Sequence, residues 1–263
     1  MSSLKRMLEI LDLYSVDHAL LTAEEISNLL SYSRGSTYRY LKELTTAGLL
    51  INAAGGYAPG PRVIELDFVI RQNDPYSSVI QPVVQSLNDQ FQCEVLASSY
   101  YRGRVVVTHH IKGSDELTMS FGRGRRMPLF LGAGSKVILA GMKKRQLQLI
   151  YENSAEQRTS SIVPPNWDDF YAEMSKIRRA GHAVSRSELD VGNVGVAVPL
   201  SLNSMGSIVL VFTSKRYEML DQKRVAKLLM GAAEQANAMI TNIESGGPQV
   251  DWLVPPNPIV KKV

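Results

Sequence analysis

Two helix-start signals lie close together near the N-terminus, and they constrain the fold more than any other feature of the chain. The segment Thr22-Ala23-Glu24-Glu25 has the spacing of a capping box, in which the threonine hydroxyl caps the helix and the last glutamate reaches back. Ser33 is placed to cap a second helix, which we expect to run from Arg34 to about Thr46 and to end at Gly48. Two short helices separated by so tight a turn are typical of a helix-turn-helix.

Elements on both sides complete a small domain. Residues 4–14 carry an apolar helical stripe, and the second helix of the pair has a core stripe of Tyr38, Leu41 and Leu44. Residues 49–51 and 57–59 are expected as the strands of a hairpin, and 61–72 as a linker helix with partly buried apolar residues. This order predicts a winged helix-turn-helix, whose second paired helix enters the major groove of DNA.

The second helix of the pair begins with an acid-free, basic stretch. Residues 33–42 hold three cations, although residues 1–75 carry seven Lys/Arg and nine Asp/Glu and so have a net charge of −2. If this part binds DNA, its cations must be concentrated on one element. The alternative, a solvated basic helix face, is less favoured within this order of elements. The expected DNA-binding residues are Ser33, Arg34, Ser36, Thr37, Tyr38, Arg39, Lys42 and Arg62.

The rest of the chain alternates strands and helices and indicates a second, α/β domain. We expect an N-terminal domain over 1–73, a second domain over 74–245 and a flexible Pro-rich tail over 246–263. Asp74-Pro75 is expected to start a helix as N-cap and first residue. The predicted strands are 94–101, 104–111, 116–121, 182–188, 194–202 and 207–213, and the predicted helices are 75–91, one from Ser135, 167–180 and 216–243.

Several functional classes are disfavoured. Among 263 residues there is no apolar run long enough to span a bilayer and no signal-peptide pattern, and the single cysteine, Cys93, cannot form an internal disulfide or a multi-cysteine zinc site. This pattern fits a cytoplasmic protein. His109 and His110 would point to opposite faces of a strand, which disfavours joint metal binding. Walker, GxSxG and HExxH motifs are missing from the sequence, so we expect no cofactor, no metal and no enzymatic activity.

Several sequence blocks together resemble the IclR family of bacterial transcriptional regulators. In the N-terminal part they are residues 21–27, 33–41 and 57–62, with Arg34-Gly35-Ser36-Thr37 where the family usually has Pro-Lys-Ser-Thr. Downstream they are residues 124–129, 132–136, 178–182 and 192–200. Each block is weakly specific, but their order and spacing are strong, and the resemblance spans about 3–243.

The resemblance implies a GAF-like effector domain that binds a small organic acid or aromatic compound. Backbone amides at Ala133, Gly134 and Ser135, at a helix N-terminus, are suited to a carboxylate, although a loop that merely needs glycine geometry is the alternative. Family members that bind small keto acids present an acid and a cysteine where this chain has Ser185 and Gly195, which favours a bulkier, aromatic effector. The expected effector-binding residues are Met127, Leu129, Phe130, Gly132, Ala133, Gly134, Ser135, Ser185, Gly195 and Val196.

The sequence thus predicts a ligand-responsive regulator of a catabolic operon. Its expected partners are double-stranded operator DNA, a small organic-acid effector and further copies of itself, in a dimer or a dimer of dimers. Two alternatives stay open: an effector-independent DNA-binding regulator, and a small-molecule enzyme fused to a DNA-binding domain.

Overall fold

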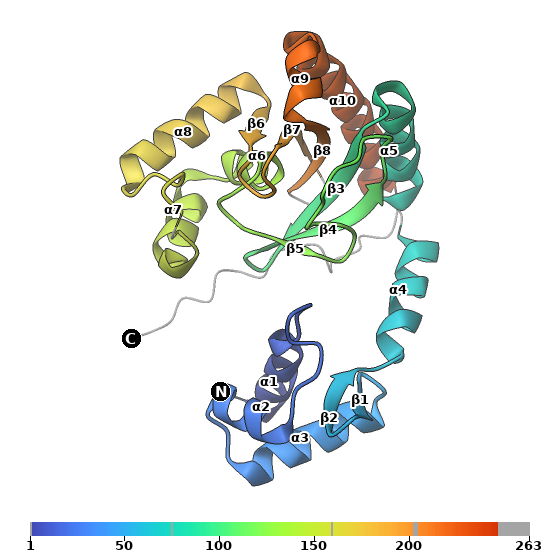
Figure 1. The fold of residues 1–263 in the computed structure, drawn as a ribbon, viewed down its shortest axis with the longest axis vertical. Coiled ribbons are helices and arrows are strands. Elements are labelled where there is room, and N and C mark those ends of the chain that lie inside the picture. Colours follow the sequence, from blue (N-terminus) through green and yellow to red (C-terminus); the bar gives the residue numbers. More distant parts are fainter. Residues whose placement is uncertain (1, 75, 159, 202–204, 247–263) are drawn as a thin grey trace. The chain divides into compact units, whose positions relative to one another are not determined.

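The computed structural model describes residues 2–74, 76–158, 160–201 and 205–246, so the predicted Pro-rich tail lies outside the described residues beyond position 246. The chain divides into two compact units, Met1–Asp74 and Pro75–Val263 (Figure 1). Each unit has its own buried core, formed by one cluster in the first and by two clusters in the second.

The first unit is a winged helix-turn-helix. Its elements are α1 (Ser3–Glu9), a 3-10 helix (Ile10–Leu13), α2 (Ala23–Leu30), α3 (Arg34–Thr46), β1 (Leu50–Ala53), β2 (Gly56–Pro59) and α4 (Arg62–Asn73). Both halves of the predicted capping box at Thr22 and Glu25 are present, and the Ser33 hydroxyl accepts a hydrogen bond from the Ser36 amide. Strands β1 and β2 pair antiparallel and form the wing.

Two predictions for this unit are wrong. Tyr38 is 57% exposed, and Tyr40 takes its place in the core, because the buried face of α3 is formed by residues 37, 40, 41 and 44. The linker helix α4 has no buried residue, and the apolar side chains predicted to be partly buried on it are exposed, because it packs its apolar positions against no core of its unit.

The second unit is a six-stranded antiparallel sheet covered by helices on both faces. The strand order is β5-β4-β3-β8-β7-β6, and the strands are β3 (Glu94–Tyr101), β4 (Arg104–Ile111), β5 (Arg126–Met127), β6 (Ala183–Arg186), β7 (Asn193–Leu200) and β8 (Gly206–Thr213). One face packs against α5 (Ser77–Phe91) and α10 (Gln222–Gly246). The other packs against α6 (Ala133–Gly141), α7 (Lys144–Asn153) and α8 (Trp167–Ala180) (Figure 1).

Several predicted elements of the second unit need correction. Residues 116–121 form no strand; their alternating side chains Leu117, Met119 and Phe121 pack onto the sheet from a segment that has no ladder partner. Helix α5 begins at Ser77, so Asp74 is not its N-cap. The last predicted helix is two helices, α9 (Ser214–Met219) and α10, and α7 was not predicted.

Candidate functional site

The exposed face of α3 is basic. The buried positions of the helix lie on one side, so Arg34, Tyr38, Arg39 and Lys42 are left on the solvent side. None of these three cations forms an ion pair with an acid in the described part of the chain; the Arg39 guanidinium lies 5.3 Å from the centroid of the Tyr40 ring. Unpaired cations on one helix face are what phosphate binding requires.

A polar groove of about 520 Å³ lies beside α3. It is bounded by Tyr38, by the start of α2 at residues 22–24 and by the wing at residues 52–57. Helix, wing and groove therefore form one continuous surface of the first unit.

Two of the predicted DNA-binding residues have other contacts. Thr37 is fully buried, and its hydroxyl donates to the backbone carbonyl of Ser33, so its side chain belongs to the core rather than to a DNA-binding face. Arg62 is exposed at the start of α4, where its guanidinium is 2.5 Å from the Glu65 carboxylate. The remaining predicted residues, Ser33, Arg34, Ser36, Tyr38, Arg39 and Lys42, lie together on α3 and its cap.

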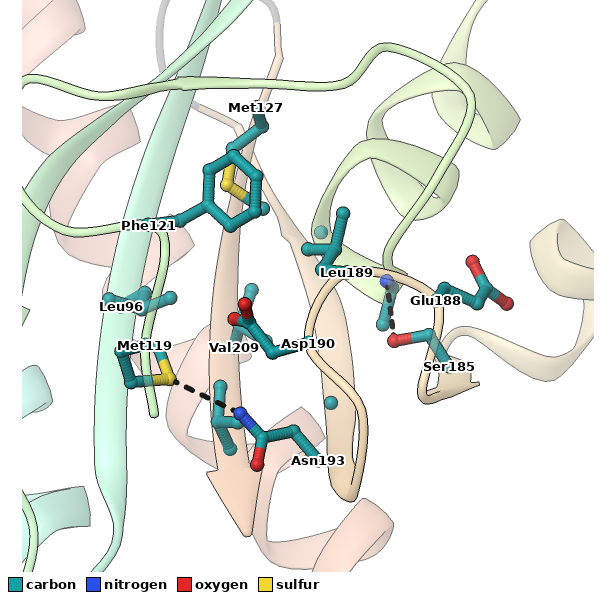
Figure 2. A pocket seen from close by; sticks show the side chains of 14 residues that line it. Leu96, Met119, Phe121, Met127, Ser185, Glu188, Leu189, Asp190, Asn193 and Val209 are labelled. Atoms are coloured by element: carbon teal, nitrogen blue, oxygen red, sulfur yellow. Dashed lines mark hydrogen bonds between the residues drawn. The ribbon is translucent and has the colours of Figure 1, made fainter. Parts of the chain in front are cut away.

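The second unit contains a cavity between the sheet and the N-terminus of α6. Figure 2 shows side chains from β3, β7 and β8 as one wall and the loop of residues 187–193 as another. The lining residues are Leu96, Met119, Phe121, Met127, Ala133, Gly134, Ser185, Glu188, Leu189, Asp190, Asn193, Gly195, Val209 and Val211. The cavity is mostly apolar with a few fixed polar groups, which is the usual character of a small-molecule site.

The first amides of α6 are already used. The Gly132 amide donates to the Glu188 carboxylate at 2.8 Å, and the Ala133 amide donates to the Ser185 hydroxyl at 3.0 Å. Among the hydrogen bonds of the described residues, none uses the Gly134 amide. Of the predicted anion-binding amides, Gly134 is therefore the one that both lines the cavity and has a free donor.

The loop of residues 187–193 is fastened on two sides. Asp190 accepts hydrogen bonds from the amide and the hydroxyl of Ser120, and the Asn193 side chain donates to the Thr118 carbonyl at 2.9 Å. On the other side, Glu188 is 2.7 Å from the Lys136 ammonium. The loop thus joins the 118–121 segment to α6 across the top of the cavity.

The predicted effector residues divide between the cavity and the surrounding core. Met127, Ala133, Gly134, Ser185 and Gly195 line the cavity. The other five lie outside it for separate physical reasons. Leu129 and Phe130 are buried in the core, where Phe130 packs edge-on against Tyr151 and Phe170.

The Ser135 hydroxyl donates to the Pro128 carbonyl, and Gly132 lies behind Leu189, whose side chain occupies the space of a Cβ at that position. The assignment of Val196 is wrong, because its side chain packs on the opposite face of the sheet, in the core formed with α5 and α10.

Nine residues that line the cavity were not predicted from the sequence. Three lie on regular strands, where the alternation along β3 and β8 could have identified them: Leu96, Val209 and Val211. The other six lie on irregular segments or at their edge: Met119, Phe121, Glu188, Leu189, Asp190 and Asn193.

The cavity is small, about 40 Å³. This is room for water-sized molecules and is far below the several hundred Å³ of typical ligand pockets. The predicted space for a ring above Ser185 and Gly195 is therefore not open in this conformation: a Cβ added at Gly195 would already lie 3.0 Å from Ser185 Oγ and 3.7 Å from Ala133 Cβ.

Three further features of the described residues bear on function: their possible metal ligands, the cysteine thiol, and the length and hydropathy of their helices. Within them, no group of three or more His, Cys, Asp or Glu side chains is arranged to hold a metal ion. Burial raises the pKa of the Cys93 thiol to about 12. No helix among the described residues has the length and apolar character needed to cross a membrane.

Family models match both units. Residues 3–51 match the IclR helix-turn-helix domain, and residues 72–238 match the bacterial transcriptional regulator IclR C-terminal domain. The chain is 24% identical over 204 residues to the probable transcriptional regulator SauR of Cupriavidus necator, with 75% of this chain and 79% of that protein covered. It is 21% identical over 181 residues to the HTH-type transcriptional regulator KipR of Bacillus subtilis, with 68% and 72% covered.

Solved structures show the same fold. An IclR transcriptional regulator from Alicyclobacillus acidocaldarius matches with a TM-score of 0.75 and 18% identity, over 90% of this chain and 98% of that chain. An IclR homologue from Microbacterium hydrocarbonoxydans, complexed with 4-hydroxybenzoate, matches with a TM-score of 0.69 and 17% identity, over 92% and 100%. The winged helix, the basic α3 face and the two family matches lead to one conclusion: this chain belongs to the IclR family and is a DNA-binding transcriptional regulator.

Proposed function

We propose that this regulator responds to a small organic ligand bound in the cavity of its second unit. The observation that carries the proposal is a cavity at the N-terminus of α6, covered by two irregular segments that are fastened to each other by side-chain hydrogen bonds. A ligand that binds one arrangement of these segments better than another shifts the balance between them. The regulated genes are those of a catabolic operon, and the regulator acts in the cytoplasm, where bacterial DNA lies.

The ligand is a small organic acid, and an aromatic acid is favoured. Its carboxylate binds at the Gly134 amide and the Ser185 hydroxyl, where the α6 dipole favours negative charge. A ring needs more than about 40 Å³, so Leu189 and the side chains of residues 119 and 121 move when it binds. The homologue complexed with 4-hydroxybenzoate supports an acid of this size in this fold.

Operator DNA is bound by the exposed face of α3. Arg34, Arg39 and Lys42 contact the duplex, helped by Ser33, Ser36 and Tyr38 at the start of the helix, and Arg62 contacts the backbone. A cation that contacts phosphate contributes about one unit to the slope of log affinity against log salt, whereas a base-reading arginine contributes to specificity at one position.

The DNA contacts are tested on a site selected by the full chain from a random DNA pool. Alanine at Arg34, Arg39 or Lys42 should weaken binding and either reduce the salt slope by about one or relax one base preference. Lys176→Ala, at an exposed position of α8, is the matched control and should leave binding unchanged. Unchanged operator binding in all three α3 variants would exclude this assignment.

The regulator binds DNA as a homodimer, or as a dimer of dimers. The apolar side chains of α4 are exposed, with Ile64 at 73% and Phe68 at 62%, and contiguous apolar surface of this kind marks a protein–protein contact. Two symmetric heads read a palindrome-like site with half-sites one helical turn, or a multiple of it, apart. Ile64→Glu with Phe68→Glu should shift the sedimentation of the full chain toward the monomer and weaken operator binding, whereas Gln72→Glu on the same helix should do neither.

Ligand response is tested by adding 4-hydroxybenzoate to the complex of the full chain with its selected site. Calorimetric binding together with a change in DNA affinity supports the proposal. Ligand binding that leaves DNA affinity unchanged favours an effector-independent regulator.

A further inference from the structure

The charged side chains that line the ligand cavity are all acidic. They are Glu188 and Asp190, and no Lys, Arg or His is among the lining residues found in the described chain. Two acidic side chains are unexpected in a site proposed to bind an acid. The hydrogen bonds and ion pairs of each carboxylate therefore decide whether it repels the carboxylate of a ligand or accepts a hydrogen bond from another part of it.

The charge of Glu188 is compensated within the protein. Its carboxylate accepts the Gly132 amide at 2.8 Å and lies 2.7 Å from the Lys136 ammonium. Figure 2 shows this carboxylate turned away from Leu189 and Asp190, on the Ser185 side of the loop. Lys136 also lies 3.3 Å from the Glu173 carboxylate, so Glu188 shares its cation with a second acid.

Asp190 is different, because neutral donors alone hold its carboxylate. The Ser120 amide at 3.1 Å and the Ser120 hydroxyl donate to it, and no cation pairs with it in the part of the chain that the structure describes. Figure 2 shows the carboxylate directed into the space between Phe121 and Asn193, in front of Val209. A partly enclosed carboxylate with free lone pairs is a strong hydrogen-bond acceptor.

The neighbouring surface carries further carboxylates, most of which have charge partners. A hollow of about 360 Å³ lies on the same sheet face and shares Met119 and Phe121 with the cavity as walls. Glu94, Asp115 and Glu116 line it together with Lys112 and His110; His110 pairs with Glu94, and Arg216 pairs with Asp115. An anion at the Asp190 end of the cavity would therefore meet the Asp190 carboxylate itself, whereas two of the three carboxylates beyond Met119 and Phe121 have charge partners.

We infer that Asp190 determines the specificity of the cavity: it selects a ligand that carries a hydroxyl or ammonium donor at the end remote from α6, and it rejects a carboxylate at that end. The inference rests on the proposed ligand response. It narrows the organic acid to a monoacid with a donor at its far end, a hydroxy acid or an amino acid, and excludes a diacid.

The test is calorimetry on the full chain with three probes that share one ring: 4-hydroxybenzoate, benzoate and terephthalate. Because a hydrogen bond to a charged group is worth about ten-fold or more in affinity, the wild type should prefer 4-hydroxybenzoate over benzoate by about ten-fold and bind terephthalate most weakly. Asp190→Asn keeps the shape and removes the charge; it should reduce the hydroxyl preference to about three-fold or less and improve terephthalate binding. Glu234→Gln, an exposed carboxylate of α10 on the opposite face of the sheet, is the control and should keep the wild-type order.

Equal affinity of the three probes for the wild type, or an unchanged preference in Asp190→Asn, would overturn the specificity role alone. If the wild type binds none of the three probes, both the role of Asp190 and the proposal that the ligand is an aromatic acid are overturned. Tight binding of 4-hydroxybenzoate with no effect on DNA affinity would contradict the proposed ligand response but not the role of Asp190.

Discussion

Gly134 sets how closely α6 approaches the sheet beneath the cavity of the second unit. A Cβ added at this position would lie 2.9 Å from Val209 Cγ2 and 3.2 Å from Ser207 Oγ. Neither neighbour yields easily, because Val209 is a β-branched residue of the central strand β8 and Ser207 is fully buried. Gly134→Ala should therefore force α6 away from the sheet, at a cost of about 1–3 kcal/mol for overpacking.

Gly141, on the same helix, provides the matched control. An added Cβ there meets nothing within 4 Å, so Gly141→Ala should gain only the helix propensity of alanine, about 0.5–1 kcal/mol. Gly134→Ala makes a similar propensity gain, so the difference between the two variants isolates the steric overlap and should be about 1–3 kcal/mol.

Urea unfolding followed by tryptophan fluorescence reports on the unfolding of the second unit, because both tryptophans of the chain, Trp167 and Trp252, belong to it. Equal unfolding free energies for the two variants would refute the close approach of α6 to β8. Gly134→Ala should also weaken 4-hydroxybenzoate binding, while operator binding through α3 persists.

Three further predictions concern single side chains. Thr22→Ala removes the α2 cap and should destabilise the first unit by about 1 kcal/mol in thermal unfolding; Thr46→Ala, at an exposed position at the end of α3, should cost less. Burial raises the pKa of Tyr14 from 10.0 to about 12, so its contribution to folding is complete below pH 10 and is lost as the pH rises toward 12. Tyr14→Phe should therefore flatten the alkaline decline in stability seen by circular dichroism, and an unchanged decline would contradict this cause. Leu189→Ala empties space above the cavity and should strengthen binding of 4-hydroxybenzoate in calorimetry; weaker binding would show that Leu189 is a wall rather than a cover.

The sequence was most informative where local rules decide the structure. Thr22, Glu25 and Ser33 specify helix starts through their own side-chain hydrogen bonds, and these contacts form as predicted. The predicted bounds Arg34–Thr46 for α3 and Trp167–Ala180 for α8 are confirmed. The mixed α/β architecture with an N-terminal helix-turn-helix is likewise confirmed.

The lining of the cavity was less predictable, because tertiary contacts decide it. Adjacent residues of a strand point to opposite faces, so Gly195 and Val196 could not both line the cavity as predicted; the tertiary contact with α6 decides that Gly195 does. The segment 116–121 alternates like a strand, yet its inward side chains cover the cavity without a ladder. Asp190 reaches the cavity through a loop whose path depends on Ser120, seventy residues away in sequence.

The most direct test of ligand-responsive regulation is the affinity of the full chain for its selected DNA site, measured by fluorescence anisotropy with and without saturating 4-hydroxybenzoate. A coupling of about 1–3 kcal/mol between the two sites predicts a change of at least about five-fold, in either direction. DNA affinity that stays constant within about two-fold, while calorimetry shows the ligand bound, would contradict ligand-responsive regulation.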